Sequence, residues 1–277
     1  MIATFTIGFI LFFFYMAYYL FMIRMSRKGV DIPEEPGYSP KVSIVVPTYN
    51  EEATIEKKLT NLMTQDYKGE VETIIIDSAS SDRTVELAEK FCQEKGLKVT
   101  MLTEKERKGK AHSLNYTFEH CSGDIVIMTD ADASWEETAI SRAILNFSNP
   151  EIGAVTGRQV LFNPKQSLAT QTEVTYRDIY ETLRIGETVL DSTPIFHGSL
   201  ACYRRSLLNK VSEDSMADDS ELAVKVRRKG YRAIYDPRAI FYEYAPPTFK
   251  SRFVQKVRRR QGLVQLFLRE WQFLLNP

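Results

Sequence analysis

The sequence predicts an α/β domain built on a mostly parallel sheet, with one membrane-spanning helix ahead of it. From residue 42 onward, short β-branched runs alternate with segments of helical spacing. These runs are continuously apolar, which is typical of strands that helices cover on both faces. The membrane helix is indicated by residues 2–23, which carry no charged side chain.

The uncharged stretch at 2–23 is long enough to cross a bilayer. A helix of this length spans about 33 Å, and the hydrocarbon core is roughly 30 Å thick. A buried core helix is the less favoured alternative, because a helix that is apolar on every face rarely fits a domain of this size. A cleaved signal peptide is disfavoured because the cations Arg24, Arg27 and Lys28 follow the apolar run instead of preceding it.

These cations predict that the C-terminal side of the helix lies in the cytoplasm. We therefore expect a single transmembrane helix at 1–25 in the cell membrane. A proline-containing linker is expected at 26–41, and a cytoplasmic globular domain at 42–248. Residues 249–277 are expected to form an amphipathic helix, packed on the domain or lying at the membrane interface.

The pattern of the globular part gives its elements in order. The expected strands are 42–46, 71–76, 98–102, 124–129 and 153–160. The expected helices are 51–64, 83–95, 110–120 and 136–147. In sheets of this kind ligands bind at the carboxyl ends of the strands, so the polar residues that follow each strand are the candidates for function.

Composition excludes several classes of protein. The 277 residues carry 36 basic and 36 acidic side chains, and this zero net charge argues against a nucleic-acid partner. The three cysteines are far apart in the sequence and show no metal-binding or disulfide spacing. No glycine-rich dinucleotide fingerprint or P-loop is present, which disfavours a dehydrogenase and a P-loop ATPase.

Two acidic residues give the strongest local signal. Asp130 and Asp132 end the apolar strand 124–129, and paired carboxylates there are costly unless a cation compensates them. Mg²⁺ prefers one or two carboxylates together with phosphate oxygens and water, so this pair favours a divalent metal site. Asp77 ends the strand 71–76, where its carboxylate is placed to accept a hydrogen bond from a nucleobase.

Three other segments have a plain structural alternative as well as a functional one. Thr48 and Glu51 follow the first strand and have the spacing of a helix capping box. Lys110 begins a helix, where its cation and the backbone N–H groups would meet a phosphate, although the surrounding charges are also typical of a solvated run. Asp218 and Glu221 form a second candidate capping box, whereas the adjacent Asp218 and Asp219 supply a candidate general base.

Taken together, these segments resemble the family 2 glycosyltransferases with the GT-A fold over about residues 41–262. The segments are VSIVVPTYNEE (42–52), IIIDSASSDRT (74–84), GKAHSLN (109–115), TDADAS (129–134), FHGSLACYRRSLL (196–208), DDSELAVKVRRKGYRAIYDP (218–237) and QKVRRRQG (255–262). The resemblance implies a nucleotide-sugar donor, with a UDP-sugar favoured over a GDP-sugar. It also implies Mg²⁺ or Mn²⁺ as cofactor and sugar transfer with inversion.

The resemblance assigns a role to each matching residue. Asp219 is the implied catalytic base, and His197, Gly198 and Asp218 line the implied acceptor site. Asp132 is the implied main metal ligand, with Asp130 contacting both metal and donor. The remaining donor-binding residues implied are Thr48, Tyr49, Glu51, Asp77, Lys110, Asp130, Gln255, Arg258 and Arg259.

This chain departs from the family pattern at three positions. Ser78 stands where many relatives have a second Asp, and Asp218 replaces the usual Glu. Arg259 stands where the family motif has a Trp, which accompanies processive extension in polysaccharide synthases. This last departure favours a short acceptor: a lipid-linked sugar, a polyprenyl phosphate or another saccharide. Membrane lipid is a further expected partner.

Three alternatives stay open. The first is a processive polysaccharide synthase that lacks the further membrane helices which relatives carry after this point. The second is an inactive, nucleotide-binding membrane scaffold, against which the acids Asp130, Asp132 and Asp219 argue. The third is a nucleotidyltransferase, which is disfavoured because no glycine-rich signature loop follows the first strand.

Overall fold

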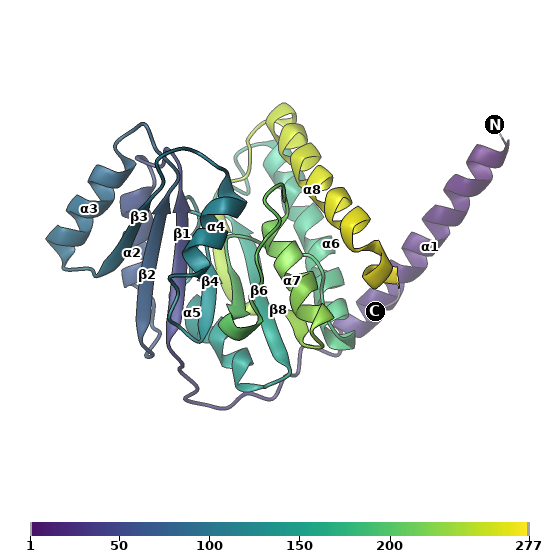
Figure 1. Cartoon of the computed structure of the whole chain (residues 1–277). Helices are drawn as coiled ribbons and strands as arrows, with labels where there is room; N and C mark the ends of the chain where they lie inside the picture. Colours follow the sequence, from purple (N-terminus) through teal and green to yellow (C-terminus); the bar gives the residue numbers. More distant parts are fainter. Residues whose placement is uncertain (1, 276–277) are drawn as a thin grey trace.

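The computed structural model describes residues 2–275 and shows an eight-stranded mixed sheet with helices on both faces (Figure 1). The strand order is β3-β2-β1-β4-β7-β6-β8-β5. The strands are β1 Val42–Thr48, β2 Val71–Asp77, β3 Val99–Thr103, β4 Ile125–Met128, β5 Ser134–Trp135, β6 Ile152–Leu161, β7 Ala201–Arg204 and β8 Arg232–Glu243. The α-helices are α1 Ile2–Ser26, α2 Ile55–Met63, α3 Thr84–Lys95, α4 Lys110–Phe118, α5 Ala139–Leu145, α6 Leu168–Leu190, α7 Asp218–Arg228 and α8 Phe249–Leu275.

The sheet has a parallel half and a mixed half. Strands β3, β2, β1 and β4 are all parallel, as the alternating strand–helix pattern predicts. Beyond β4, strand β7 is antiparallel to both of its neighbours, β6 and β8 are parallel, and β5 is antiparallel to β8. Four of the seven strand pairings are therefore parallel, and the polar ends of β1, β2 and β4 meet at one edge.

Alternate side chains of the central strands enter two separate cores. On one face Ile44 and Ile75 pack with Leu59 of α2, with residues of α3, and with Ile140 of α5. On the other face Val45, Ile74 and Ile76 pack against residues of α4 and α7. This double covering explains why the strand sequences are apolar throughout.

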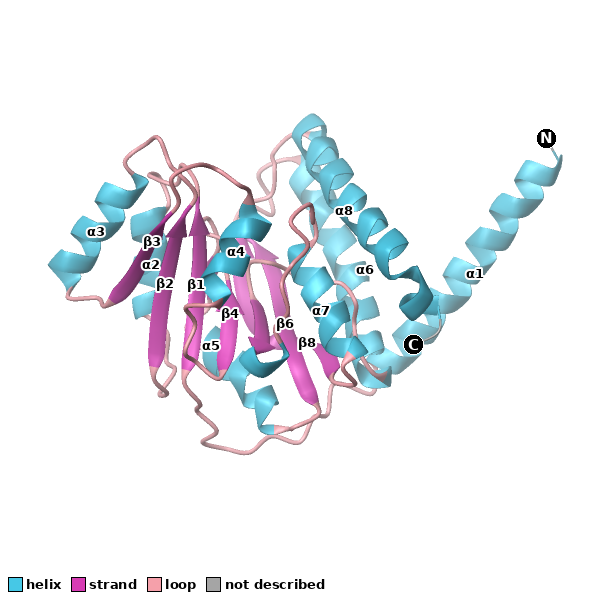
Figure 2. Ribbon diagram, in the orientation of Figure 1, coloured by secondary structure: helices cyan, strands magenta, loops and turns pink. Residues whose placement is uncertain are grey.

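The expected elements are all present, with modest differences at their ends. Strand β1 extends to Thr48 and α2 begins only at Ile55, because residues 51–54 form a turn. Thr48 therefore does not cap a helix, and Thr54, which precedes α2, makes no side-chain capping bond. Strands β5 and β7 complete the fold around the expected elements, together with strand β8 and helix α6, which are labelled in Figure 2.

Helix α1 leaves the body of the domain, and only its C-terminal end packs on α6 (Figure 1). Its segment Gly8–Ser26 is, among the residues described, the one helix that is long and apolar enough to cross a bilayer. At the contact with α6, Met22 and Met25 are buried and the Tyr18 hydroxyl donates to Glu187 Oε1 at 2.7 Å.

Helix α8, at the C-terminal end of the chain, packs against α6 and α7 (Figure 2). Arg252 donates to the Ala169 carbonyl of α6 at 2.7 Å, and Arg228 of α7 pairs with Glu270 at 2.9 Å. The apolar side chains of α8 are largely exposed: Phe249, Phe253, Val254, Val257, Val264, Phe267, Leu268 and Trp271. Helix α8 is thus amphipathic as predicted, with its polar face directed to the domain.

Candidate active site

The carboxyl ends of β1 and β2 form a tightly bonded corner. Asp77 is buried, and its Oδ1 accepts hydrogen bonds from Thr48 Oγ1 at 3.1 Å and Ser80 Oγ at 2.5 Å. Its Oδ2 accepts from the Ser80 backbone N–H at 2.9 Å. Asp77 therefore organises the loop after β2, and Oδ2 retains a lone pair for a ligand.

A carboxylate lies beside Ser78, the position at which this chain departs from the family pattern. Glu104, which directly follows β3, accepts hydrogen bonds from Ser78 Oγ and Ser113 Oγ, both at 2.8 Å. His112 Nδ1 lies 2.7 Å from its Oε1. Although burial opposes it, these hydrogen bonds lower the pKa of Glu104, so this corner keeps a second negative charge.

Tyr49 and Glu51 follow β1 at the same edge of the sheet. The Tyr49 ring is partly exposed and stacks against the Arg107 guanidinium, 3.8 Å from the ring centroid. Glu51 is held by the Thr54 hydroxyl at 2.5 Å. Burial and the negative charge of Asp132 raise the pKa of Glu51, which shows that carboxylates gather here.

The loop after β4 gives its two aspartates different surroundings. Asp130 Oδ1 accepts a hydrogen bond from Lys110 Nζ, and its Oδ2 accepts one from Ser199 Oγ, both at 2.8 Å. These contacts outweigh burial and lower the pKa of Asp130 to about 2. Asp132 is exposed to solvent. Desolvation of its carboxyl by the surrounding protein, and after it the negative charge of Asp130, nevertheless raise the pKa of Asp132.

The two aspartates suit a divalent cation. Asp132 offers free carboxylate oxygens, and the mutual repulsion of Asp130, Asp132 and Glu51 is the kind that a cation relieves. Among the described residues no three acidic, histidine or cysteine side chains converge on one point. Such a pair matches the way Mg²⁺ or Mn²⁺ is held by few carboxylates and completed by ligand phosphates.

Lys110 connects the loop after β4, which we call the metal loop (residues 129–134), to Asp218 and Asp219 at the start of α7. Its Nζ lies 2.8 Å from Asp130 Oδ1 and 3.6 Å from Asp218 Oδ2. A Cβ placed on Gly198 would lie 3.4 Å from Lys110 Nζ and 3.6 Å from Asp219 Oδ2. Gly198 thus lies at the point where Lys110, Asp130 and Asp219 approach one another.

Asp219 has the properties of a general base. Burial, reinforced by the neighbouring Asp218, raises its pKa to about 7, although Lys110 acts in the opposite direction. Its Oδ1 accepts the Ser220 backbone N–H at 2.6 Å, and the Tyr203 hydroxyl donates to its carbonyl at 2.8 Å. A carboxyl with this pKa is ready to take a proton near neutral pH.

The capping alternative for Asp218 and Glu221 is wrong. Helix α7 begins without a side-chain cap, and Glu221 is fully buried among other partners. Its Oε1 accepts from Lys225 Nζ at 2.6 Å, and its Oε2 lies 3.1 Å from Arg269 Nη1. Glu221 is therefore a structural residue that ties α7 to α8.

Lys58 is a buried cation that the sequence pattern does not reveal. Its side chain from α2 reaches behind the metal loop, where Nζ donates to Thr129 Oγ1 at 2.5 Å and to the Ala133 carbonyl at 3.0 Å. Nζ also lies 4.4 Å from the centre of the Trp135 ring. Burial lowers the pKa of Lys58 to about 7. Lys58 occupies a buried position of α2, and nothing in the local sequence distinguishes it from a solvated lysine. Only its contacts with Thr129 and Ala133 in the folded chain identify its role.

Ser199 and Glu243 extend the network from the metal loop toward α8. Ser199 Oγ bonds Asp130 Oδ2 and also Glu243 Oε1. Burial raises the pKa of the Glu243 carboxyl, whereas the positive charge of Arg259 acts in the opposite direction. Arg259 Nη2 of α8 lies 3.8 Å from Glu243 Oε2.

The remaining expected residues divide into two sets. His197 lies next to Gly198 and packs against Phe241, with ring centroids 5.5 Å apart. Arg259 reaches the site through Glu243. Within residues 2–275, no hydrogen bond or ion pair connects Gln255 or Arg258 to the site.

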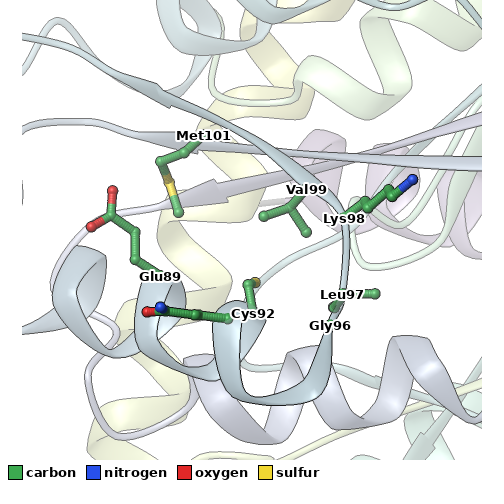
Figure 3. Close-up of a pocket in the computed structure, with 8 residues that line it drawn as sticks. Glu89, Cys92, Gly96, Leu97, Lys98, Val99 and Met101 are labelled. Atoms are coloured by element: carbon green, nitrogen blue, oxygen red, sulfur yellow. The ribbon is translucent and has the colours of Figure 1, made fainter.

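A separate pocket of about 480 Å³ lies between the end of α3 and the edge strand β3 (Figure 3). It is lined by Glu89, Cys92, Gln93, Gly96, Leu97, Lys98, Val99 and Met101. None of these is a residue of the site just described, and the pocket is shallow and open to solvent. The chemistry therefore belongs to the carboxyl edge of the sheet and not to this pocket.

A sheet of this topology with a carboxylate pair at its carboxyl edge defines a glycosyltransferase domain of the GT-A type. Residues 43–212 match the family model described as "Glycosyl transferase family 2". The chain therefore belongs to this family. The mannosyltransferase PcManGT of Pyrobaculum calidifontis, solved with GDP-Man and Mn²⁺, superposes with a TM-score of 0.82 at 36% identity. That likeness covers 93% of this chain and 71% of the mannosyltransferase.

Two curated relatives are more distant and longer. The poly-beta-1,6-N-acetyl-D-glucosamine synthase of Staphylococcus aureus is 28% identical over 92% of this chain, which spans 62% of that synthase. The probable glycosyltransferase YdaM of Bacillus subtilis is 29% identical over 80% of this chain, which spans 55% of that protein. The fold of TarS of S. aureus is also similar, with a TM-score of 0.56 at 19% identity.

Proposed function

We propose that this chain is an inverting, metal-dependent glycosyltransferase. It moves a sugar from a nucleotide-sugar donor to a lipid-linked or membrane-proximal acceptor at the cytosolic face of the membrane. The observation that carries the proposal is the convergence of Lys110, Asp130 and Asp219 around Gly198. One cation, one acid of the loop after β4 and one proton acceptor then approach the same point.

The donor's nucleotide would occupy the edge formed by β1, β2 and β3. Asp77 and Glu104 provide negative oxygen atoms there, and a uracil or guanine ring offers N–H groups to such acceptors. We take a UDP-sugar as the first candidate. The GDP-Man bound to the similar mannosyltransferase makes a GDP-sugar the second.

Asp132, with Asp130 beside it, would hold the divalent cation. When bound, this ion would offset the negative charge that develops on the diphosphate as it leaves. Lys110 adds a protein cation at the same place, and Asp130 keeps it there through their 2.8 Å contact. Mn²⁺ in the related mannosyltransferase supports this choice of cofactor.

The transfer itself needs one base and no nucleophile from the protein. The acceptor's O–H, on a sugar or on a phosphomonoester, gives its proton to the Asp219 carboxylate, and its oxygen attacks the anomeric carbon as the bond to the diphosphate breaks. A single displacement of this kind inverts the anomeric configuration. A retaining mechanism would need a second carboxylate as nucleophile close to the anomeric carbon.

The membrane side of the proposal depends on α1 and α8. Helix α1 is long enough to anchor the chain, and Arg24, Arg27 and Lys28 favour a cytoplasmic location for its C-terminal side. The exposed apolar face of α8 suits the boundary between lipid headgroups and acyl chains. The acceptor would accordingly come from the membrane itself.

A processive polysaccharide synthase is the second candidate, favoured by the likeness to the poly-beta-1,6-N-acetyl-D-glucosamine synthase. The two candidates differ in product length. A single-transfer enzyme adds one sugar to each acceptor, whereas a synthase produces a ladder of products at limiting acceptor. Electrophoresis or mass spectrometry of the lipid-linked products separates them.

The proposal is tested by release of UDP or GDP from a panel of nucleotide sugars, with Mn²⁺ and either a polyprenyl phosphate or a lipid-linked sugar. We expect release by the wild-type chain, a loss of about a thousandfold or more in Asp219→Asn, and strong impairment of Asp132→Ala. The matched control is Asp214→Asn, an exposed acid that pairs with Arg269 away from the site. An inactive scaffold would bind nucleotide and release none from any donor.

A further inference from the structure

A group of cations lies where helices α6 and α8 face each other. We call it the α6–α8 basic cluster, and it consists of Arg177, Arg184, Arg252, Lys256 and Arg259. Glu173 of α6 and Glu243 of β8 form ion pairs with members of this cluster. The charges of Glu187 and Asp219 also act on Arg184.

Part of this cluster is structural. Arg252 Nη2 lies 2.6 Å from Glu173 Oε2, and Lys256 Nζ lies 3.1 Å from the same oxygen. Lys256 also sits 3.2 Å from the centre of the Tyr176 ring. Glu173 is thus the carboxylate that joins α6 to α8, and these two cations share its negative charge with Arg177.

The other cations are poorly satisfied. Within the described chain Arg184 has no ion pair or hydrogen bond, and its buried Nε has no acceptor. The buried Nε of Arg177 has none either, although an ion pair with Glu173 lies 3.3 Å away. The nearby carboxylates of α6 are engaged elsewhere, Glu181 with Arg158 and Glu187 with Tyr18 and Thr193. Buried guanidinium groups without acceptors cost free energy unless a ligand supplies them.

The pKa of His197 reflects the positive charge of three of these arginines. Burial, and after it the cations Arg184, Arg177 and Arg259, lower the pKa of His197 well below its ordinary value. Burial also lowers the pKa of Arg177 to about 10. The imidazole Nε2 is itself buried without a partner. A neutral histidine near three cations, with a buried nitrogen that has no partner, favours the binding of an anion here.

The cluster lies on the acceptor side of the candidate base. A Cβ on Gly198 would lie within 4 Å of Lys110, Asp130 and Asp219, whereas the charges of the arginines of α6 and α8 act on the preceding His197. Lys110, together with the cation that Asp132 and Asp130 would hold, would already provide positive charge for the donor's diphosphate. The charge of Asp219 also acts on Arg184, which places that guanidinium near the base.

We infer that Arg177, Arg184 and Arg259, with His197, bind the phosphate of a phosphorylated lipid acceptor. This inference rests on the proposed function, because it names the substrate class of the same site. Guanidinium groups match phosphate oxygens in a forked, two-bond geometry. Helix α6 also carries α1, whose backbone at Met22 packs directly on Gly186, so a lipid beside α1 has its headgroup near the cluster.

Direct binding tests the inference without requiring turnover. The probes are farnesyl phosphate and the neutral alcohol farnesol, titrated against the full chain in detergent. We expect the wild type to bind the phosphate in preference to the alcohol. Arg184→Gln and Arg177→Gln should each weaken farnesyl phosphate binding by about tenfold or more, the loss of a charged hydrogen bond. Arg184→Lys should recover part of it.

The matched control is Arg227→Gln, since Arg227 pairs with Asp191 outside the cluster. Its affinity for farnesyl phosphate should equal that of the wild type, and all variants should keep the wild-type circular dichroism spectrum. The inference is overturned if Arg184→Gln binds farnesyl phosphate normally, if it instead loses affinity for UDP or GDP, or if phosphatidylglycerol displaces the probe as well as farnesyl phosphate does. Absence of sugar transfer with intact, Arg184-dependent binding would reject the proposed enzyme and keep this site.

Discussion

Asp219 determines the pH dependence expected of the reaction. Its pKa of about 7 results from burial and from Asp218, and is held down by Lys110. Because only the carboxylate accepts a proton, kcat/KM should rise with pH and level off above about 7. Asp218→Asn removes a neighbouring negative charge and should move this limb to lower pH. Rate measurements in which the limb stays in place would contradict the assignment of Asp219 as the titrating base.

The same carboxyl should make the folded state less stable as pH rises. The folded pKa of Asp219 lies above its unfolded value of 3.8, so the folded chain binds more protons between about 4 and 7. The contribution of Asp219 to stability is therefore greatest at low pH and is lost as pH rises through that window. Asp219→Asn should be relatively more stable than the wild type at pH 8 than at pH 4, as measured by chemical denaturation.

Lys58 is expected to hold the metal loop at a cost in stability. Its folded pKa of about 7 is far below its unfolded value of 10.5, so the penalty of its buried charge is present at neutral pH and is relieved as pH rises toward 10.5. Lys58→Met should therefore gain stability relative to the wild type at pH 7 and lose that gain at higher pH. It should also slow transfer by about ten- to a hundredfold, because the loop between Thr129 and Ala133 loses its tie. Lys57→Met, at an exposed position of the same helix, is the control and should change neither quantity.

At the scale of elements, the sequence predicts the parallel half of the sheet well and the other half poorly. Strands β1, β2 and β4 carry runs of consecutive apolar residues because both of their faces are covered. Helix α6 lacks such a signal: its buried positions include Thr170, Glu173, Gly186 and Thr188. These are small or polar residues that pack on α1, α8 and β8, and their burial depends on partners far away in the sequence.

The site shows the same division. The acids that follow strand ends are visible as motifs because their spacing is local. Lys58, Ser199 and Glu243 come from three distant segments, and only the folded chain places them around Asp130. Arg177 and Arg184 are separated by seven positions on α6, and nothing local distinguishes them from solvated arginines.

The contact between α1 and α6 depends on one glycine. A Cβ on Gly186 would lie 2.8 Å from the Met22 carbonyl oxygen, a backbone atom that cannot yield without moving α1. Gly186→Val should push α1 away and weaken hydrogen-exchange protection in the second half of α6, with a cost of roughly 1–3 kcal/mol. Gly8→Val is the matched control, because a Cβ there meets nothing within 4 Å. Equal protection in both variants would show that α1 does not depend on this close approach.

For the whole molecule, the proposed function makes α1 and α8 the elements that set the orientation toward a bilayer. The segment Gly8–Ser26 of α1 is long and apolar enough to cross a membrane, and the exposed face of α8 adds Phe253 and Leu268, which are 70% and 67% exposed. Helix α6 contacts both α1 and α8, and the charges of its Arg177 and Arg184 act on His197. In the proposed orientation the acceptor site would be bordered by α1 and α8, and the nucleotide edge at β1 and β2 would face the aqueous side.

This orientation predicts that α8 matters for a lipid acceptor and not for the donor. Phe253→Ser combined with Leu268→Ser should lower transfer to a vesicle-embedded polyprenyl phosphate by roughly tenfold, because these side chains no longer enter the headgroup region. Metal-dependent hydrolysis of the nucleotide sugar should be unchanged, since neither side chain contacts the site. Val71→Ser, at an exposed position at the start of β2, is the control for loss of an exposed apolar side chain. If the double variant transfers to vesicle-embedded acceptor as well as the wild type does, α8 is a packing helix of the domain and the bilayer contacts α1 alone.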